Sequence, residues 1–185
     1  NRCAPFFFPL QSKSIIKMQK CFFLICPTDC LEQTINKSFT YVNYFYSSLG
    51  NSFVYDRKTI GHLGEIIEKH QIKKIYFVLS MDNKIVEGAL NNNSNNNFSN
   101  TIALDNFNTE IRKQKEQSKI VSREENLQFS LLSYLLNNKI KEFEIQLSNI
   151  LNEPVKIGGK IYNRELDVFT PIYSDLICLE KYHFN

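Results

Sequence analysis

Short apolar runs separated by polar turns organise the first half of the chain. Residues 20–26 (KCFFLIC) form a continuous apolar run that ends at Pro27, as is typical of a strand buried on both faces. Residues 75–79 form a second such run, and between the two the apolar residues of 59–70 recur at helical spacing. A strand, a helix and a parallel strand make a β-α-β unit, so the pattern predicts an α/β fold with a mostly parallel sheet and flanking helices.

Turns and low-complexity sequence divide these elements. A short helical turn is expected at 31–36, and the Gly50-Asn51 pair indicates a turn with positive φ. The tract at 91–97 (NNNSNNN) has nothing to bury, so we expect a mobile Asn-rich surface loop over 91–100.

The second half of the chain predicts helices followed by a β-hairpin. Residues 105–120 are charged and amphipathic, and 124–151 are rich in Leu, Ile and Phe. Because these apolar positions are too many for one exposed helix, the second helix must pack on the sheet or on another subunit. Residues 155–169 alternate around a polar turn, which favours a C-terminal edge strand with its return, and we place Gly158-Gly159 at a turn.

Composition indicates one globular domain. The chain has 185 residues, 43% of them hydrophobic, and a net charge of +3, too small to indicate a nucleic-acid or membrane surface. No apolar run is long enough to span a bilayer. Five cysteines, an odd number, favour reduced thiols in a cytoplasmic protein. We expect a natural start at Met18, residues 1–17 as a disordered or upstream extension, and a single domain over 18–185.

Few residues carry an obvious chemistry. Cys26 and Cys30 have metal-permitting spacing but lack a second pair of ligands, so we interpret the cysteines at the first strand as buried structural residues. The sequence has neither a Gly-rich phosphate loop nor a G-x-S-x-G elbow. Ser80 at the second strand end is interpreted as a helix N-cap, and Asp82 as a first-turn residue that suits the helix dipole.

The order of these pieces resembles the β-class carbonic anhydrases. The residues that carry the resemblance are a strand ending in Cys-x-x-Asp (26–29), a Gly-Asn turn at 50–51, the strand IKKIYFVLS (72–80), and VKIGGKIYN (155–163) as a late edge strand. The resemblance covers about residues 20–169. It implies the family's α/β fold, subunits that form dimers, and a zinc ion held by Cys, His and Cys beside an Asp-Arg pair, which generates hydroxide for attack on carbon dioxide.

Carried onto this chain, the family pattern keeps one of three zinc ligands. Cys26 matches the first ligand, but Ser80 and Asn83 stand where His and Cys are expected, and neutral hydroxyl and amide groups do not replace imidazole and thiolate. Asp29 is one position later than the family's Asp, and Cys30 stands at the place of its Arg. The predicted vestigial pocket therefore consists of Cys26, Asp29, Cys30, Asn51, Ser80, Asp82 and Asn83.

Three functional hypotheses follow. The first is a non-catalytic, carbonic-anhydrase-like homodimer without a cofactor, whose pocket holds a small polar molecule or anion at the helix start. The second is an active carbonate dehydratase in which Cys26, Asp29 and Asp82, or a distant His, bind zinc. The third is an assembly or regulatory subunit that works through an apolar face at 127–151. No nucleic-acid partner and no membrane insertion are expected.

Overall fold

A five-stranded sheet forms the centre of the molecule. The computed structural model describes residues 18–52, 55–90, 109 and 127–173. The strands are β1 (Lys20–Ile25), β2 (Val42–Ser47), β3 (Lys74–Ser80), β4 (Lys156–Asn163) and β5 (Val168–Pro171), and the α-helices are α1 (Glu32–Ser38), α2 (Arg57–His70), α3 (Lys84–Leu90) and α5 (Leu127–Ser148). Short 3-10 turns, η1 (Pro27–Asp29) and η2 (Leu49–Asn51), follow β1 and β2.

The sheet confirms the predicted fold class. Its strand order is β2-β1-β3-β4-β5. The first four strands are parallel, and β5 runs antiparallel to β4 at the edge. The predicted β-α-β unit is β1 and β3 with α2 between them in the chain, and the predicted hairpin is β4 with β5. All four parallel strands therefore end at the same edge of the sheet, where ligand sites of open α/β sheets are usually found.

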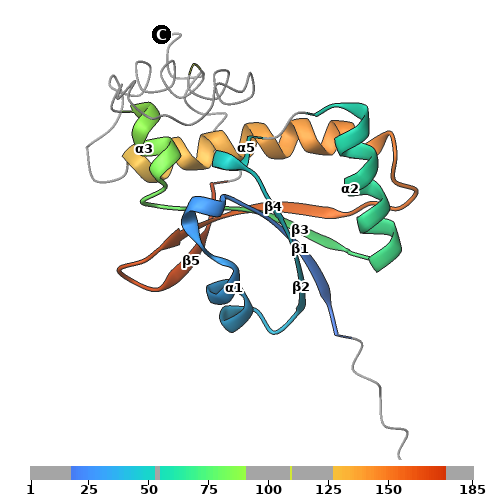
Figure 1. The fold of residues 1–185 in the computed structure, drawn as a ribbon, viewed down its shortest axis with the longest axis horizontal. Helices are drawn as coiled ribbons and strands as arrows, with labels where there is room; N and C mark the ends of the chain where they lie inside the picture. The colour runs from blue at the N-terminus through green and yellow to red at the C-terminus, as the bar shows by residue number, and fades with distance from the viewer. Residues whose placement is uncertain (1–17, 53–54, 91–108, 110–126, 174–185) are drawn as a thin grey trace, which may run out of the picture.

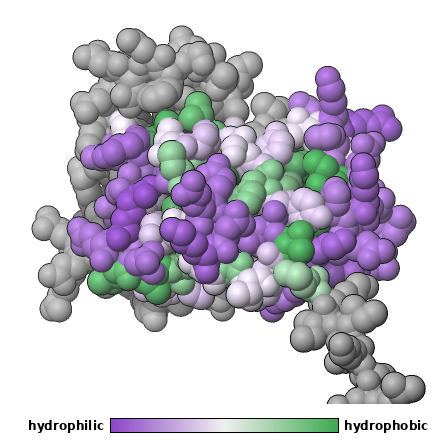
Figure 2. Space-filling view, turned by 60° about the horizontal axis from the view of Figure 1, so that its bottom comes forward, coloured by the Kyte–Doolittle hydropathy of each residue, from purple (hydrophilic) through white to green (hydrophobic). Residues whose placement is uncertain are grey.

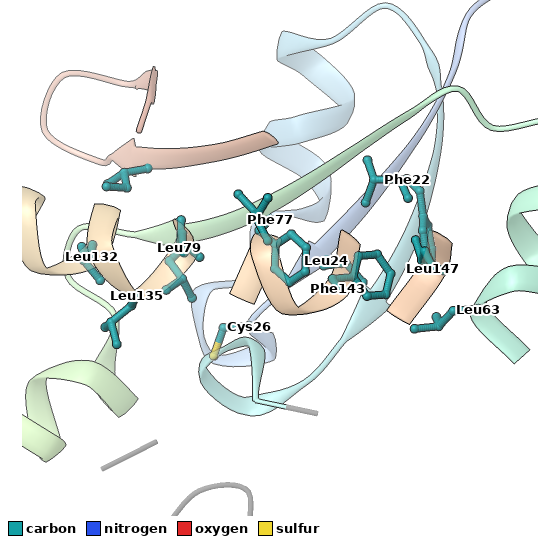
Figure 3. Packing of buried hydrophobic residues seen from close by; sticks show 14 of the residues in the cluster. Phe22, Leu24, Cys26, Leu63, Phe77, Leu79, Leu132, Leu135, Phe143 and Leu147 are labelled. Atoms are coloured by element: carbon teal, nitrogen blue, oxygen red, sulfur yellow. The ribbon is translucent and has the colours of Figure 1, made fainter. Parts of the chain in front are cut away.

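Three helices cover one face of the sheet. Figure 1 shows α2, α3 and α5 above the strands and α1 below them. The main core lies between the strands and these three helices, where the ring of Phe77 on β3 meets the ring of Phe143 on α5 edge to face at 5.5 Å between centroids. Figure 3 shows Phe22, Leu24 and Cys26 of the first strand region in the same layer. Burial of these apolar side chains is the main term that stabilises the fold.

Helix α5 packs on the sheet of its own chain. Leu132, Leu135, Leu136, Phe143 and Leu147 are all buried in the main core. Its large apolar content, which predicted packing on the sheet or on another subunit, is thus largely accounted for within one chain. Ile145 is an exception at 63% exposed. Homodimer formation stays a prediction.

The Gly158-Gly159 pair lies inside β4, so its placement at a turn was wrong. Gly158 pairs with Tyr76 and Gly159 with Phe77 in the parallel ladder with β3. The reason is steric, because a Cβ on Gly159 would lie 2.5 Å from Cδ1 of Ile172 and 3.2 Å from Cδ1 of Ile140. Glycine in a strand interior marks a close approach of other atoms, and the turn of the hairpin comes later, at 164–167.

The Gly-Asn turn was predicted correctly. Gly50 and Asn51 have φ of 58° and 56° in η2, the left-handed region that Gly and Asn tolerate best. The Asn-rich loop over 91–100, most of the helix at 105–120, and residues 1–17 lie outside the described residues. Within the described part, no helix is long and apolar enough to cross a membrane.

Candidate functional site

Polar residues gather where β1 and β3 end. The chain leaves β1 through Cys26 and η1, and it leaves β3 at Ser80 before α3 begins at Lys84. Because β1 and β3 are adjacent and parallel, their carboxyl ends place Asp29, Ser80 and Asn83 next to one another. These three side chains belong to buried residues.

Asp29 is the centre of the cluster. Its Oδ2 accepts a hydrogen bond from the backbone N–H of Ser80, and its Oδ1 accepts one from Nδ2 of Asn83, both at 2.8 Å. Burial raises the pKa of Asp29 to about 6, although the two hydrogen bonds and the Arg164 guanidinium favour the ionised form. The carboxylate thus joins η1 to the β3–α3 turn in a dry environment.

Asn83 begins α3. Its Oδ1 accepts hydrogen bonds from the backbone N–H groups of Ile85 at 3.1 Å and Val86 at 3.0 Å, which is the geometry of an N-cap. The N-cap assigned to Ser80 from the sequence was therefore wrong, because β3 continues through Ser80 and the helix starts four residues later, at Lys84. Two backbone donors at the helix start, where an anion was expected, are already bonded to Asn83.

The turn η2 brings Cys26 close to Asn51, the last residue of η2. The thiol Sγ of Cys26 accepts a hydrogen bond from the backbone N–H of Gly50 at 3.1 Å and lies 3.0 Å from Oγ1 of Thr28. Asn51 donates from Nδ2 to the carbonyl of Val78 at 3.0 Å. The loop after β2 is therefore anchored to the ends of both β1 and β3.

Asp82 and Arg164 form the exposed rim of the cluster. Nε of Arg164 donates to both carboxylate oxygens of Asp82 at 3.1 Å, and Nη2 donates to the backbone carbonyl of Asp29. Asp82 also accepts from the hydroxyl of Ser80. Burial opposes ionisation of Asp82, but the hydrogen bond from Ser80 and the charge of Arg164 hold its pKa below the usual value. Asp82 precedes α3 rather than lying in its first turn.

Sequence reasoning missed Arg164. It follows β4 directly, and β4 pairs with β3 in parallel. The carboxyl end of β4 therefore meets the same edge as Ser80. If the predicted late strand had been paired with β3, the residue that follows that strand, Arg164, would have been expected at this edge.

Cys30 differs from the other predicted pocket residues. It ends η1 with φ of 52°, and its exposed thiol donates to the carbonyl of Pro27 at 3.5 Å. Of the other predicted residues, Asp29, Ser80, Asp82 and Asn83 are connected by hydrogen bonds to one another. Cys26 bonds to Gly50, and Asn51 bonds to Val78.

The donor set of this cluster fits zinc poorly. Cys26 supplies the one thiol, Ser80 and Asn83 supply neutral oxygen and nitrogen atoms, and both oxygens of Asp29 already accept hydrogen bonds. In the described part of the chain, no three His, Cys, Asp or Glu side chains are grouped so that they could hold a metal ion. Zinc sites usually need about three such ligands.

A separate cavity lies at the other end of the strands. Its volume is about 730 Å³, and it is lined at the amino ends of β1, β3 and β4 by residues that include Lys20, Ile72, Lys73, Glu153 and Val155. Two of its lining residues, Lys73 and Glu153, form an ion pair. None of the predicted pocket residues lines it.

Comparison with known proteins shows that the fold is similar to solved structures of β-carbonic anhydrases. The wild-type β-carbonic anhydrase CafD of the filamentous fungus Aspergillus fumigatus superposes with a TM-score of 0.62 at 14% identity, over 89% of this chain and 94% of that one. A structure from a study of two tetrameric β-carbonic anhydrases of Sordaria macrospora gives 0.62 at 12% identity, over 84% and 80%. The Coccomyxa enzyme in complex with acetazolamide gives 0.51 at 9% identity, over 84% and 72%.

Sequence comparison does not assign the chain to a family. No family model matches the chain, and no curated protein matches it. Identities this low carry the fold alone, so the likeness extends to the sheet, its flanking helices and their order. The chain has the fold of the β-carbonic anhydrases.

Proposed function

We propose that this chain is a non-catalytic protein built on the β-carbonic anhydrase fold, acting as a small-ligand-binding or assembly subunit. The observation that supports the proposal most is the set of hydrogen bonds made by Asn83, which stands at the position where the resemblance puts a zinc-binding Cys. Its amide bonds Asp29 on one side and caps α3 on the other. Such a side chain stabilises the strand-end structure and has no atom left for a metal.

The rim of the cluster is where a ligand would enter. Asp82 and Arg164 are about half exposed, whereas Asp29, Ser80 and Asn83 are buried. A small polar molecule or anion would compete with Asp82 for the Arg164 guanidinium, because planar guanidinium groups bind carboxylate-like oxygens in pairs. We further propose a cytoplasmic homodimer. The tetrameric assemblies of the Sordaria macrospora enzymes support self-association of this fold.

The alternative is a carbonate dehydratase with a rearranged zinc site. It would need Cys26, Asp29 and Asp82, or a distant His, to turn toward one ion, and both carboxylates would have to give up their present hydrogen bonds. A site with two carboxylates and one thiolate favours harder ions than zinc. An assay of carbon dioxide hydration separates this activity from the non-catalytic proposal.

Zinc content is the first measurement. We expect elemental mass spectrometry of the purified, folded protein to give far less than one zinc per chain, and Cys26→Ser to leave that value unchanged. About one zinc per chain, lost in Cys26→Ser, together with carbon dioxide hydration, would replace the proposal by the dehydratase.

Restoring the ligands tests the correspondence of positions. The double variant Ser80→His/Asn83→Cys should bind zinc more tightly than the wild type, because it adds an imidazole and a thiolate near Cys26. The variant Ser47→His/Asn43→Cys, on strand β2, serves as the control for non-specific binding by new His and Cys residues. If circular dichroism shows both variants folded and their zinc affinities are equal, the assigned ligand positions are wrong.

A further inference from the structure

The sheet face opposite α2, α3 and α5 is basic and aromatic. The five described strands contain four lysines and no Asp or Glu. Because alternate residues of a strand point to opposite faces, and Ile75, Phe77 and Ile161 enter the main core, Lys74, Lys156 and Lys160 lie on the other face. We call these three residues, with the rings beside them, the lysine–aromatic face.

Two of its lysines are neighbours in the ladder. Lys74 on β3 is the direct partner of Lys156 on β4. Like charges placed opposite each other destabilise a sheet, and none of the ion pairs within the described residues involves Lys74, Lys156 or Lys160. A positive row that the described part of the chain does not neutralise is a feature that a binding partner would explain.

Aromatic rings hold the amines in place. Nζ of Lys160 lies over the rings of Tyr76 at 5.3 Å and Phe39 at 5.6 Å, and Nζ of Lys74 lies 6.0 Å from the ring centre of Tyr41. Cation–π contacts of this kind fix an amine while leaving its other N–H donors available. Burial lowers the pKa of Lys160.

The rings are themselves packed and only partly buried. Phe39 contacts Phe23 at 5.5 Å, Tyr76 at 6.5 Å and Phe169 at 5.2 Å between ring centroids, and Phe39, Tyr76 and Phe169 are half-buried. Figure 2, with the lower side of Figure 1 turned forward, shows hydrophilic and apolar surface interleaved. Hydrophilic and hydrophobic residues alternate there over short distances.

We propose that the lysine–aromatic face binds an acidic, aromatic-containing segment of a partner polypeptide. Carboxylates of the partner would neutralise the Lys74–Lys156 row and accept from Lys160, and its apolar side chains would cover the half-buried rings. Single-stranded nucleic acid suits the face less well. Single strands are bound in positively charged grooves that follow the phosphate backbone, whereas this face offers three lysines and the net charge of the chain is only +3.

The test compares two substitution sets of equal charge. The face variant is Lys74→Gln/Lys156→Gln/Lys160→Gln. The control variant is Lys58→Gln/Lys69→Gln/Lys141→Gln, whose lysines are exposed on α2 and α5. The probe is a fluorescein-labelled peptide of repeated Glu-Glu-Phe, followed by fluorescence anisotropy, with labelled oligothymidylate of similar length as the competing class.

We expect the peptide to bind the wild type and the control variant with similar affinity, and the face variant about tenfold more weakly. Equal weakening in both variants, or binding of oligothymidylate without binding of the peptide, overturns the proposal. The proposal is also overturned if the peptide binds none of the proteins and sedimentation shows that the wild type and the control variant are dimers while the face variant is a monomer. The face would then bind a second copy of the chain. If the face variant does not fold, Lys156→Gln, at an exposed position, is compared with Lys141→Gln.

Discussion

At the scale of single residues, Asn83 joins two parts of the molecule. Its Oδ1 caps α3, and its Nδ2 donates to the buried carboxylate of Asp29. Loss of an N-cap costs about 1 kcal/mol, and an unpaired buried acceptor costs about 1–3 kcal/mol more. One side chain therefore supports both the start of a helix and the connection between two strand ends.

Substitution of Asn83 separates these two contributions. We expect Asn83→Ala to lower the free energy of unfolding by about 2–4 kcal/mol, because both are lost. Asn83→Ser keeps a capping oxygen but lacks the donor to Asp29, so its loss should be smaller. Urea unfolding measures both. Equal values for Ala and Ser would show that the cap contributes nothing here.

Asp29 predicts a pH dependence of stability. Its pKa in the folded state is about 6, above the ordinary value of 3.8. Between these values the folded state holds more protons than the unfolded state, so the Asp29 contribution to stability falls as pH rises from about 4 to about 6. The full change is about 3 kcal/mol. At pH values above the folded pKa, the charged carboxylate is therefore a net cost to the fold.

The variant Asp29→Asn isolates this effect. It cannot titrate, so the difference in unfolding free energy between wild type and variant should shift against the wild type as pH rises through the same window. Subtracting the variant's curve of unfolding free energy against pH removes the contributions of the other carboxylates and histidines in this pH range. A difference that stays constant with pH would mean that the folded pKa of Asp29 is not raised.

The sequence could predict the neighbourhood of these residues but not each contact. Asp29, Ser80 and Asn83 follow adjacent parallel strands, and strand topology alone places them at one edge. Cys30 is exposed and has a positive φ although it is not glycine, and the sequence holds no signal for such a backbone conformation. Arg164 was missed because its contact requires knowing that β4 pairs with β3.

At the scale of elements, the glycines of β4 and α2 differ in what surrounds them. A Cβ on Gly159 would meet side-chain atoms of Ile172 and Ile140, whereas a Cβ on Gly61 in α2 would have nothing within 4 Å. The strand glycine makes room for its neighbours. The helix glycine makes room for nothing that the structure describes.

These two positions predict changes of opposite sign. Gly159→Ala should destabilise the protein by about 1–3 kcal/mol through overpacking. Gly61→Ala should stabilise it by about 0.5–1 kcal/mol, since alanine is the better helix former and restricts the unfolded chain. Thermal unfolding of the two variants provides the measurement. A stabilised Gly159→Ala would show that Ile172 moves away at little cost.

Element types followed from the sequence where periodicity was strong. Both buried strands, α2, the long apolar helix and the final hairpin were predicted because their apolar spacing is either continuous, helical or alternating. The glycine pair in β4 was misplaced because local preference favours turns for glycine, and the opposing need comes from Ile140 and Ile172, which reach the site only in the folded chain.

At the scale of the whole molecule, one sheet separates two cores. Phe77 and Leu24 belong to the core under α2, α3 and α5, while Phe23 and Val78 belong to the aromatic core on the face that carries α1. Since β1 and β3 contribute to both cores, neither can form without the strands of the other. The single domain expected from the sequence should then unfold as one cooperative unit.

Matched substitutions in the two cores test this unity. Phe77→Leu and Phe23→Leu both replace rings with no exposed area, and each should cost about 1–2 kcal/mol. Both should shift the same single urea transition, seen alike by far-ultraviolet circular dichroism and by tyrosine fluorescence, which the absence of Trp leaves unobscured. If instead two transitions appeared and Phe23→Leu moved only one of them, the lysine–aromatic face would unfold separately from the main core. Its lysines would then be held by a less stable part of the molecule.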